Sequence, residues 1–113
     1  MFNLNEYFRN NRLPHGFVKR IECADGFSIS VQGHGGAYCL PRIDDEWGDM
    51  EYSHVECGFP SAEPEFIMDY VEDDNNPTDT VYGYVPVDLV EALIDLHNNN
   101  KKYEYTFTKF TQL

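Results

Sequence analysis

Residues 17–32 read FVKRIECADGFSISVQ, and this stretch decides the fold more than any other part of the chain. Apolar residues alternate with mostly polar ones before and after Asp25-Gly26, as in a strand that buries one face. Asp-Gly suits a type I′ turn, because glycine accepts positive φ freely and aspartate tolerates it. The stretch therefore predicts a β-hairpin. Its apolar side is Phe17, Ile21, Cys23, Phe27, Ile29 and Val31, and its polar side is Ser28, Ser30 and Gln32.

Alternation also predicts strands further along the chain. Residues 52–59 would place Val55, Cys57 and Phe59 on one face, and residues 81–85 would form a brief strand. Residues 103–107 alternate aromatic and polar side chains and would form a final strand, since such residues favour sheets.

Residues 86–98 predict the main helix. Pro86 suits a first helical turn, and Val90, Leu93, Ile94 and His97 share one face. The run of Asn residues at 98–100 would end this helix, and Ser61 would cap a shorter helix through Tyr70. We therefore expect an α+β fold, with a small antiparallel sheet of about four to five strands and one main helix packed on it.

The length and composition indicate one domain. A chain of 113 residues fits a single core, and 17 aromatic residues with a 42% apolar fraction are enough to bury one. We expect residues 17–113 to form this domain. Residues 1–16 would be an N-terminal arm with one short helical turn, and whether the arm is ordered stays open.

The sequence favours a cytoplasmic protein. It contains no run of the roughly 20 apolar residues that span a bilayer, and its first residues do not form an export signal. Its three cysteines are odd in number and sparse, so we expect reduced thiols rather than a disulfide framework.

The acidic residues are distributed very unevenly. Residues 43–100, the acidic half, contain sixteen Asp and Glu and no Lys or Arg, a charge of about −16, which leaves about +4 elsewhere. Such a field repels nucleic acid and anionic membranes and attracts basic surfaces. Ordinary soluble surfaces mix both signs, so we interpret the acidic half as a binding surface for a basic partner. A merely solvated surface is the general alternative.

The predicted partner-binding residues are carboxylates of two loops and three aromatic anchors. Tyr82 and Tyr84 flank Gly83 and would both project outward from a strand, although a buried aromatic layer under the acidic loop at residues 44–51 is an equal alternative. The full set is Asp44, Asp45, Glu46, Trp47, Asp49, Glu72, Asp73, Asp74, Tyr82 and Tyr84.

Metal sites and catalysis are the weaker interpretations. His54 and Cys57, with His34 and Cys39, have the donor types of a zinc site, but residues three apart on a strand point to opposite faces. The carboxylates at 72–79 lack the spacing of a calcium-binding EF-hand. A nucleophilic Cys39 with His34 or His54 would sit among anions that disfavour its thiolate. We therefore predict no cofactor, no metal and no enzymatic activity.

Four segments carry a resemblance to a protein family. They are GFSISVQ at 26–32, YCLPR at 38–42, VECGFPS at 55–61 and PTDTVYGYVP at 77–86. In these segments the chain resembles a group of short, uncharacterised proteins encoded by tailed phages and prophages. The resemblance covers about residues 26–97, and its motifs imply no catalytic residue.

The resemblance implies a role against bacterial defence, because small acidic phage proteins include inhibitors such as anti-CRISPR proteins. Combined with the charge, it leads us to expect an inhibitor that covers a basic nucleic-acid-binding surface of a host defence complex. The alternatives are a phage accessory protein without a defence target and a small thiol- or metal-dependent enzyme. Self-association into a homodimer stays open.

Overall fold

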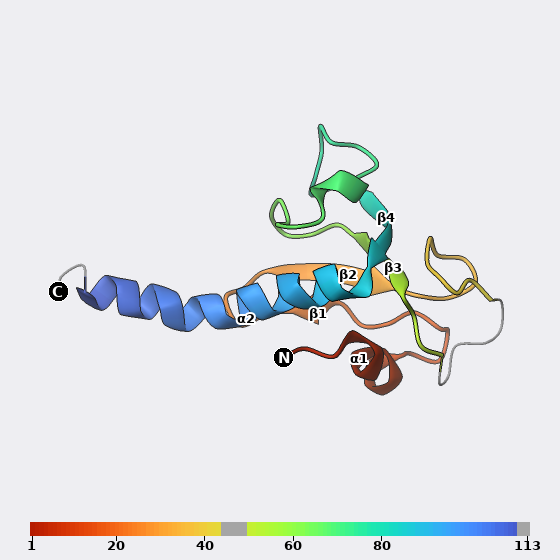
Figure 1. Cartoon of the computed structure of the whole chain (residues 1–113), viewed down its shortest axis with the longest axis horizontal. Coiled ribbons are helices and arrows are strands. Elements are labelled where there is room, and N and C mark those ends of the chain that lie inside the picture. Colours follow the sequence, from red (N-terminus) through yellow and green to blue (C-terminus); the bar gives the residue numbers. More distant parts are fainter. Residues whose placement is uncertain (44–49, 111–113) are drawn as a thin grey trace.

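The computed structural model describes residues 1–43 and 50–110, with side chains described as far as Asn99. In chain order its elements are α1 (Leu4–Asn11), β1 (Ile21–Glu22), β2 (Ser28–Gln32), β3 (His54–Gly58), the 3-10 helix η1 (Met68–Tyr70), β4 (Val81–Pro86) and α2 (Val87–Phe110) (Figure 1). The strands form one antiparallel sheet in the order β1-β2-β3-β4. The predicted α+β class is confirmed.

The predicted hairpin is present, but its turn differs from the expected type. β1 pairs with β2 through Ile21 and Ile29, and only Gly26 has positive φ in the turn. The Cys23 amide donates to the Phe27 carbonyl at 2.8 Å, and the Gly26 amide donates back to the Cys23 carbonyl at 3.0 Å. The turn is therefore a three-residue loop ending in a left-handed glycine, and the expected type I′ turn is wrong.

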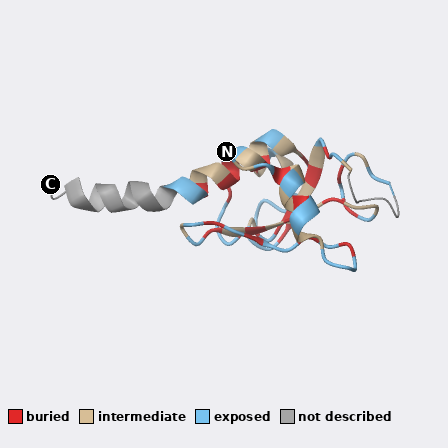
Figure 2. Ribbon diagram, turned by 90° about the horizontal axis from the view of Figure 1, so that it is seen from below, coloured by how far each residue is buried: buried red, intermediate tan, exposed pale blue. Residues whose placement is uncertain are grey.

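The sheet and α2 enclose the core. Val90, Leu93 and Ile94 on α2 are fully buried, as the helical pattern predicted, and they belong to the same core cluster as the buried residues of the strands. Figure 2 shows buried positions on the helix and on the strands. Val55 and Cys57 are buried as expected, whereas Phe59 is exposed. Phe59 has a φ of 49°, which turns its side chain out of the alternation, so its predicted inward position is wrong.

The inward residues at the start of the hairpin also differ from the prediction. Val18 is buried and Phe17 is exposed, the reverse of the expected alternation. The side chain of Gln32 explains the change, since it accepts a hydrogen bond from the Val18 amide and donates one to the Val18 carbonyl. Gln32 thus replaces a backbone partner at this position and fixes which way Val18 points.

α2 extends past the Asn residues that were expected to end it, and the strand predicted at 103–107 is helical instead. The Asn98 side chain accepts a hydrogen bond from the Ala24 amide, and the Asn99 side chain donates to the Asp95 carbonyl. Both amides are therefore satisfied without breaking the helix. A helix also pairs its backbone groups within the segment, whereas a strand needs a neighbour.

The short helix expected from Ser61 is absent, and η1 takes its place. Ser61 pairs with β2 instead, because its hydroxyl accepts from the Ser28 amide and its own amide donates to the Ser28 carbonyl. Phe66 has a φ of 71°, which a right-handed helix excludes. Ile67 beside it is fully buried and anchors the segment to the core.

The N-terminal residues form a helix that joins the core. Asn3 caps α1 by accepting a hydrogen bond from the Glu6 amide at 3.0 Å. Leu4 and Phe8 are buried, and Phe8 meets Tyr52 edge to face at 5.5 Å. The α1 helix thus contributes buried side chains to the same core as the sheet.

Gly33 provides the space for this ring pair, and a substitution there would show how tightly it is packed. A Cβ at Gly33 would lie 2.9 Å from Phe8 Cε2 and 3.0 Å from Tyr52 Cε1. We expect Gly33→Ala to lower the free energy of unfolding by about 1–3 kcal/mol, because an overpacked core must shift. Urea unfolding measures this change.

Gly36→Ala is the matched control. Its Cβ would approach only the His34 ring, at 3.4 Å, and Gly36 is exposed. We expect this variant to stay close to the wild type. Equal stability of both variants would show that the Phe8 and Tyr52 rings shift at little cost to make room for the added methyl group.

Candidate interaction surface

The acidic loop before β4 is exposed and held in a defined conformation. Glu72, Asp73 and Asp74 are all exposed in this loop. The Asp73 carboxylate accepts hydrogen bonds from the Asn75 amide at 3.1 Å and from the Asn76 side chain at 3.0 Å. Asp73 therefore shapes the loop, while Glu72 and Asp74 extend the anionic surface beside it. The predicted residues Asp44, Asp45, Glu46, Trp47 and Asp49 lie outside the described residues.

Tyr82 does not face outward, and this prediction is wrong. Its side chain is fully buried, and its hydroxyl donates a 2.5 Å hydrogen bond to the Pro77 carbonyl. Tyr82 therefore ties the acidic loop to the core from beneath. The alternative from the sequence placed an aromatic layer under the acidic loop at residues 44–51, and residues 44–49 lie outside the described residues. Tyr82 is buried, but the loop that it contacts is the one at residues 72–77.

Tyr84 is the exposed member of the pair, and a shift in strand register separates it from Tyr82. Val55 pairs with Val85 while Cys57 pairs with Tyr82, so β4 has one residue more than β3 between these pairs. The extra residue lets Tyr82 and Val85 both point inward. Tyr84 has a φ of 53°, and 41% of it is exposed.

The Tyr84 ring stacks on Tyr38, a residue that the sequence interpretation had not selected. The ring centroids are 5.9 Å apart with an angle of 28° between the planes. The Tyr84 amide donates to the Tyr38 carbonyl, and the Tyr38 amide donates to the Glu56 carboxylate at 2.7 Å. A Cβ on Gly83 would lie 3.3 Å from Tyr38 Cβ, so the glycine permits this close approach. Tyr38 is 40% exposed, which makes the pair a surface feature.

The cysteines are poorly placed for nucleophilic chemistry. Cys39 and Cys57 are fully buried, and burial raises the pKa of both thiols. Burial and the nearby Asp25 raise the pKa of Cys23 to about 11. The Cys39 thiol donates to the backbone carbonyl of His34 at 3.2 Å and not to its ring. Thiolates at neutral pH are therefore disfavoured at these positions.

The histidines considered as metal ligands make other contacts. The His34 ring stacks on Phe17 at 5.3 Å, and its Nδ1 accepts from the Gly36 amide. His54 Nδ1 lies 2.9 Å from the Ser53 hydroxyl. Within the residues that the structure describes, no group of three or more His, Cys, Asp or Glu side chains could hold a metal ion.

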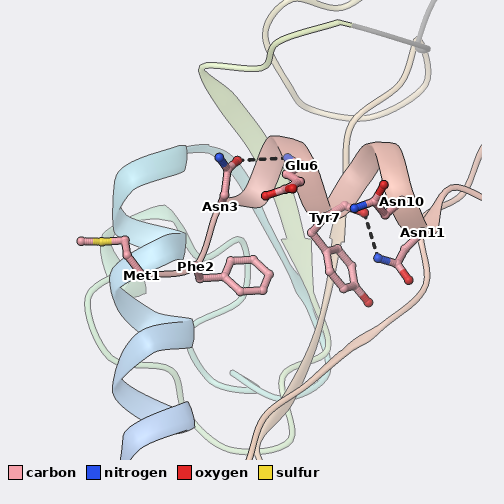
Figure 3. A pocket seen from close by; sticks show the side chains of 7 residues that line it. All are labelled: Met1, Phe2, Asn3, Glu6, Tyr7, Asn10 and Asn11. Atoms are coloured by element: carbon pink, nitrogen blue, oxygen red, sulfur yellow. Dashed lines mark hydrogen bonds between the residues drawn. The ribbon is translucent and has the colours of Figure 1, made fainter.

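A shallow hollow of about 270 Å³ runs along α1 (Figure 3). Its wall is held together by its own hydrogen bonds. The Glu6 amide donates to the Asn3 side-chain oxygen, and the Asn11 side chain donates to the Tyr7 carbonyl. The Tyr7 hydroxyl donates to the Lys19 carbonyl at 3.0 Å. The first two of these hydrogen bonds stabilise α1, and the third ties α1 to the segment before β1. The lining residues are Met1, Phe2, Asn3, Glu6, Tyr7, Asn10 and Asn11.

A charged clamp around His97 joins three segments: α2 and the loop of Glu65, both in the acidic half, and the hairpin turn at Asp25. His97 is 8% exposed, with Nδ1 2.7 Å from Asp25 and Nε2 2.8 Å from Glu65. Both ring nitrogens can donate only when the imidazole is protonated. The ring also stacks on Phe27, with centroids 4.1 Å apart. The sequence placed His97 on the inner helix face but could not reveal these distant partners.

The clamp makes stability depend on pH. Burial alone would lower the pKa of His97, but the hydrogen bonds to Asp25 and Glu65 and the charges of both carboxylates outweigh it and raise the pKa. The clamp therefore contributes fully to stability below the unfolded pKa of about 6.5 and loses its contribution as the pH rises through the folded pKa.

We expect His97→Gln to lower the free energy of unfolding by about 1–3 kcal/mol at low pH and to remove this pH dependence.

Urea titrations at a series of pH values, from below the unfolded pKa of about 6.5 to above the folded pKa, measure the loss of stability in the variant and the pH dependence of the wild type. His15→Gln is the control, because His15 is exposed and lies outside the clamp. A wild type whose stability does not fall as the pH rises would contradict the clamp.

Comparison with known proteins gives no further assignment. The chain matches no protein-family profile, no curated protein and no solved structure. In the described ranges, no helix has both the length and the apolar character needed to cross a membrane.

Proposed function

We propose that this chain is a phage-encoded inhibitor of a bacterial defence system, acting in the cytoplasm of the host. Its acidic half would cover a basic nucleic-acid-binding surface of the defence complex and exclude the nucleic acid. The observation that carries this proposal is the exposed acidic loop, fixed by Tyr82 within a segment that lacks Lys and Arg. The resemblance to short phage proteins supports the biological setting.

The exposed carboxylates support an electrostatic mode of binding. They come from several segments of the acidic half. Among those that the structure describes, Glu51 forms an ion pair with Arg9 at 2.6 Å and Glu65 forms one with protonated His97 at 2.8 Å. Uncompensated carboxylates accelerate association with a basic surface and make binding sensitive to salt. In the described residues the exposed carboxylates of this half are Glu51, Glu63, Glu65, Asp69, Glu72, Asp73, Asp74, Asp79 and Asp88.

The fixed loop geometry also favours this mode. Asp73 and Tyr82 hold the loop through hydrogen bonds, so the loop has less conformational freedom to lose on binding. The proposal requires no covalent step, which agrees with the raised pKa values of the buried thiols. Steric exclusion of the nucleic acid would be sufficient for inhibition.

Expression in bacteria tests the function. The chain is expressed in a panel of bacterial hosts, each with a different DNA-targeting defence system. We expect it to restore plaque formation by a targeted phage in at least one of these hosts. The purified defence complex from that host should then lose DNA binding when the chain is added, and salt should weaken this competition. Restored plaques without any effect on DNA binding would contradict occlusion, and no restoration across the panel would favour an accessory role.

The acidic loop provides a sharper test. We expect Glu72→Gln with Asp74→Asn to weaken binding to the inhibited complex by about 0.4–2 kcal/mol and to reduce its salt dependence, because two surface charges are removed. Asp73 is left unchanged, since it shapes the loop. Competition with labelled DNA at several salt concentrations gives both quantities.

Glu6→Gln with Glu22→Gln is the matched control. It removes the same charge from exposed residues outside the acidic half. If both double variants weaken binding equally, net charge alone explains the affinity and the assignment to this loop fails.

A further inference from the structure

Left-handed backbone is used in this protein to display aromatic side chains. In the described part of the chain, the non-glycine residues with positive φ are Phe59, Phe66 and Tyr84. All three are aromatic, and between 41% and 53% of each is exposed. Bulky residues adopt this conformation only where the surrounding structure holds them, and such positions cluster at functional sites.

Among these three, Tyr84 has a ring partner that suggests a ligand. Tyr84 and Tyr38 form a stacked surface pair, and the guanidinium carbon of Arg42 lies 5.7 Å from the centroid of the Tyr38 ring. The Arg42 Nε donates to the Gly35 carbonyl at 3.1 Å, which keeps the side chain close to this surface. The pair therefore already contacts a guanidinium from its own chain.

We infer that the Tyr38–Tyr84 pair is an anchor for an arginine of the basic partner, with Tyr84 as the ring that receives it. A planar, weakly hydrated guanidinium stacks on an aromatic ring better than the compact ammonium of lysine. The inference rests on the proposed function, since it names the chemical group that the acidic half would attract. It explains why the fold keeps Tyr84 in a strained conformation at the surface.

The charge of the chain distinguishes this occupant from the main alternative, a second copy of the protein. Each copy has a net charge of −12, so two such surfaces repel one another. An arginine-bearing surface is attracted by the same charge. Leu40 and Ile43, which are 44% and 47% exposed, add apolar area in the same part of the chain.

Two peptides of equal charge test the inference without knowledge of the partner. Nine-residue poly-arginine and poly-lysine peptides are titrated into the full chain, and affinity is measured by calorimetry. We expect the arginine peptide to bind about two- to fivefold more tightly, the range of a surface cation–π contact. The ring signals of Tyr38 and Tyr84 should shift in the NMR spectrum with the arginine peptide and much less with the lysine peptide.

Variants of Tyr84 assign the preference to this ring. Tyr84→Phe should keep it, whereas Tyr84→Asn should remove it, and asparagine tolerates the left-handed backbone. Equal affinity of the two peptides for the wild type, or an arginine preference that survives Tyr84→Asn, would overturn the inference. The Glu72→Gln/Asp74→Asn variant should weaken both peptides alike, so a failure of the anchor can be told apart from a failure of the acidic surface.

Discussion

The extra residue of β4 opposite β3 is the constraint on which the surface of this protein depends. A regular strand would send Tyr82 and Tyr84 to the same side. The register shift sends Tyr82 inward, where it holds the acidic loop through Pro77, and leaves Tyr84 outside against Tyr38. One irregularity in a strand pair thus positions both the charged loop and the aromatic pair.

The sequence predicted those parts of the fold that depend on local burial patterns. The hairpin around Gly26, the strand at 54–58 and the inner face of α2 all follow from apolar residues at the spacing of the element. The α+β class follows from the order of these elements. Such patterns are visible in a single sequence because each residue's environment repeats along its own element.

The parts that failed depend on more than the local pattern of apolar residues. The insertion in β4 is defined only against β3, and the inward direction of Val18 depends on hydrogen bonds to the Gln32 side chain. The segment at 103–107 has side chains typical of strands yet continues α2. The candidate interaction surface likewise contains residues that the sequence predicted and one that it did not. Glu72, Asp73, Asp74 and Tyr84 are exposed as expected, whereas Tyr38 became visible only through its stack with Tyr84.

The clamp at His97 has a consequence for how the chain reaches its folded state. Between the unfolded and folded pKa values the free imidazole is largely neutral and the clamped one is charged, so folding takes up a proton from solution. The heat measured on folding must then include the ionisation heat of the buffer that supplies this proton. By this uptake the acidic half, which has no Lys or Arg, obtains an internal cation.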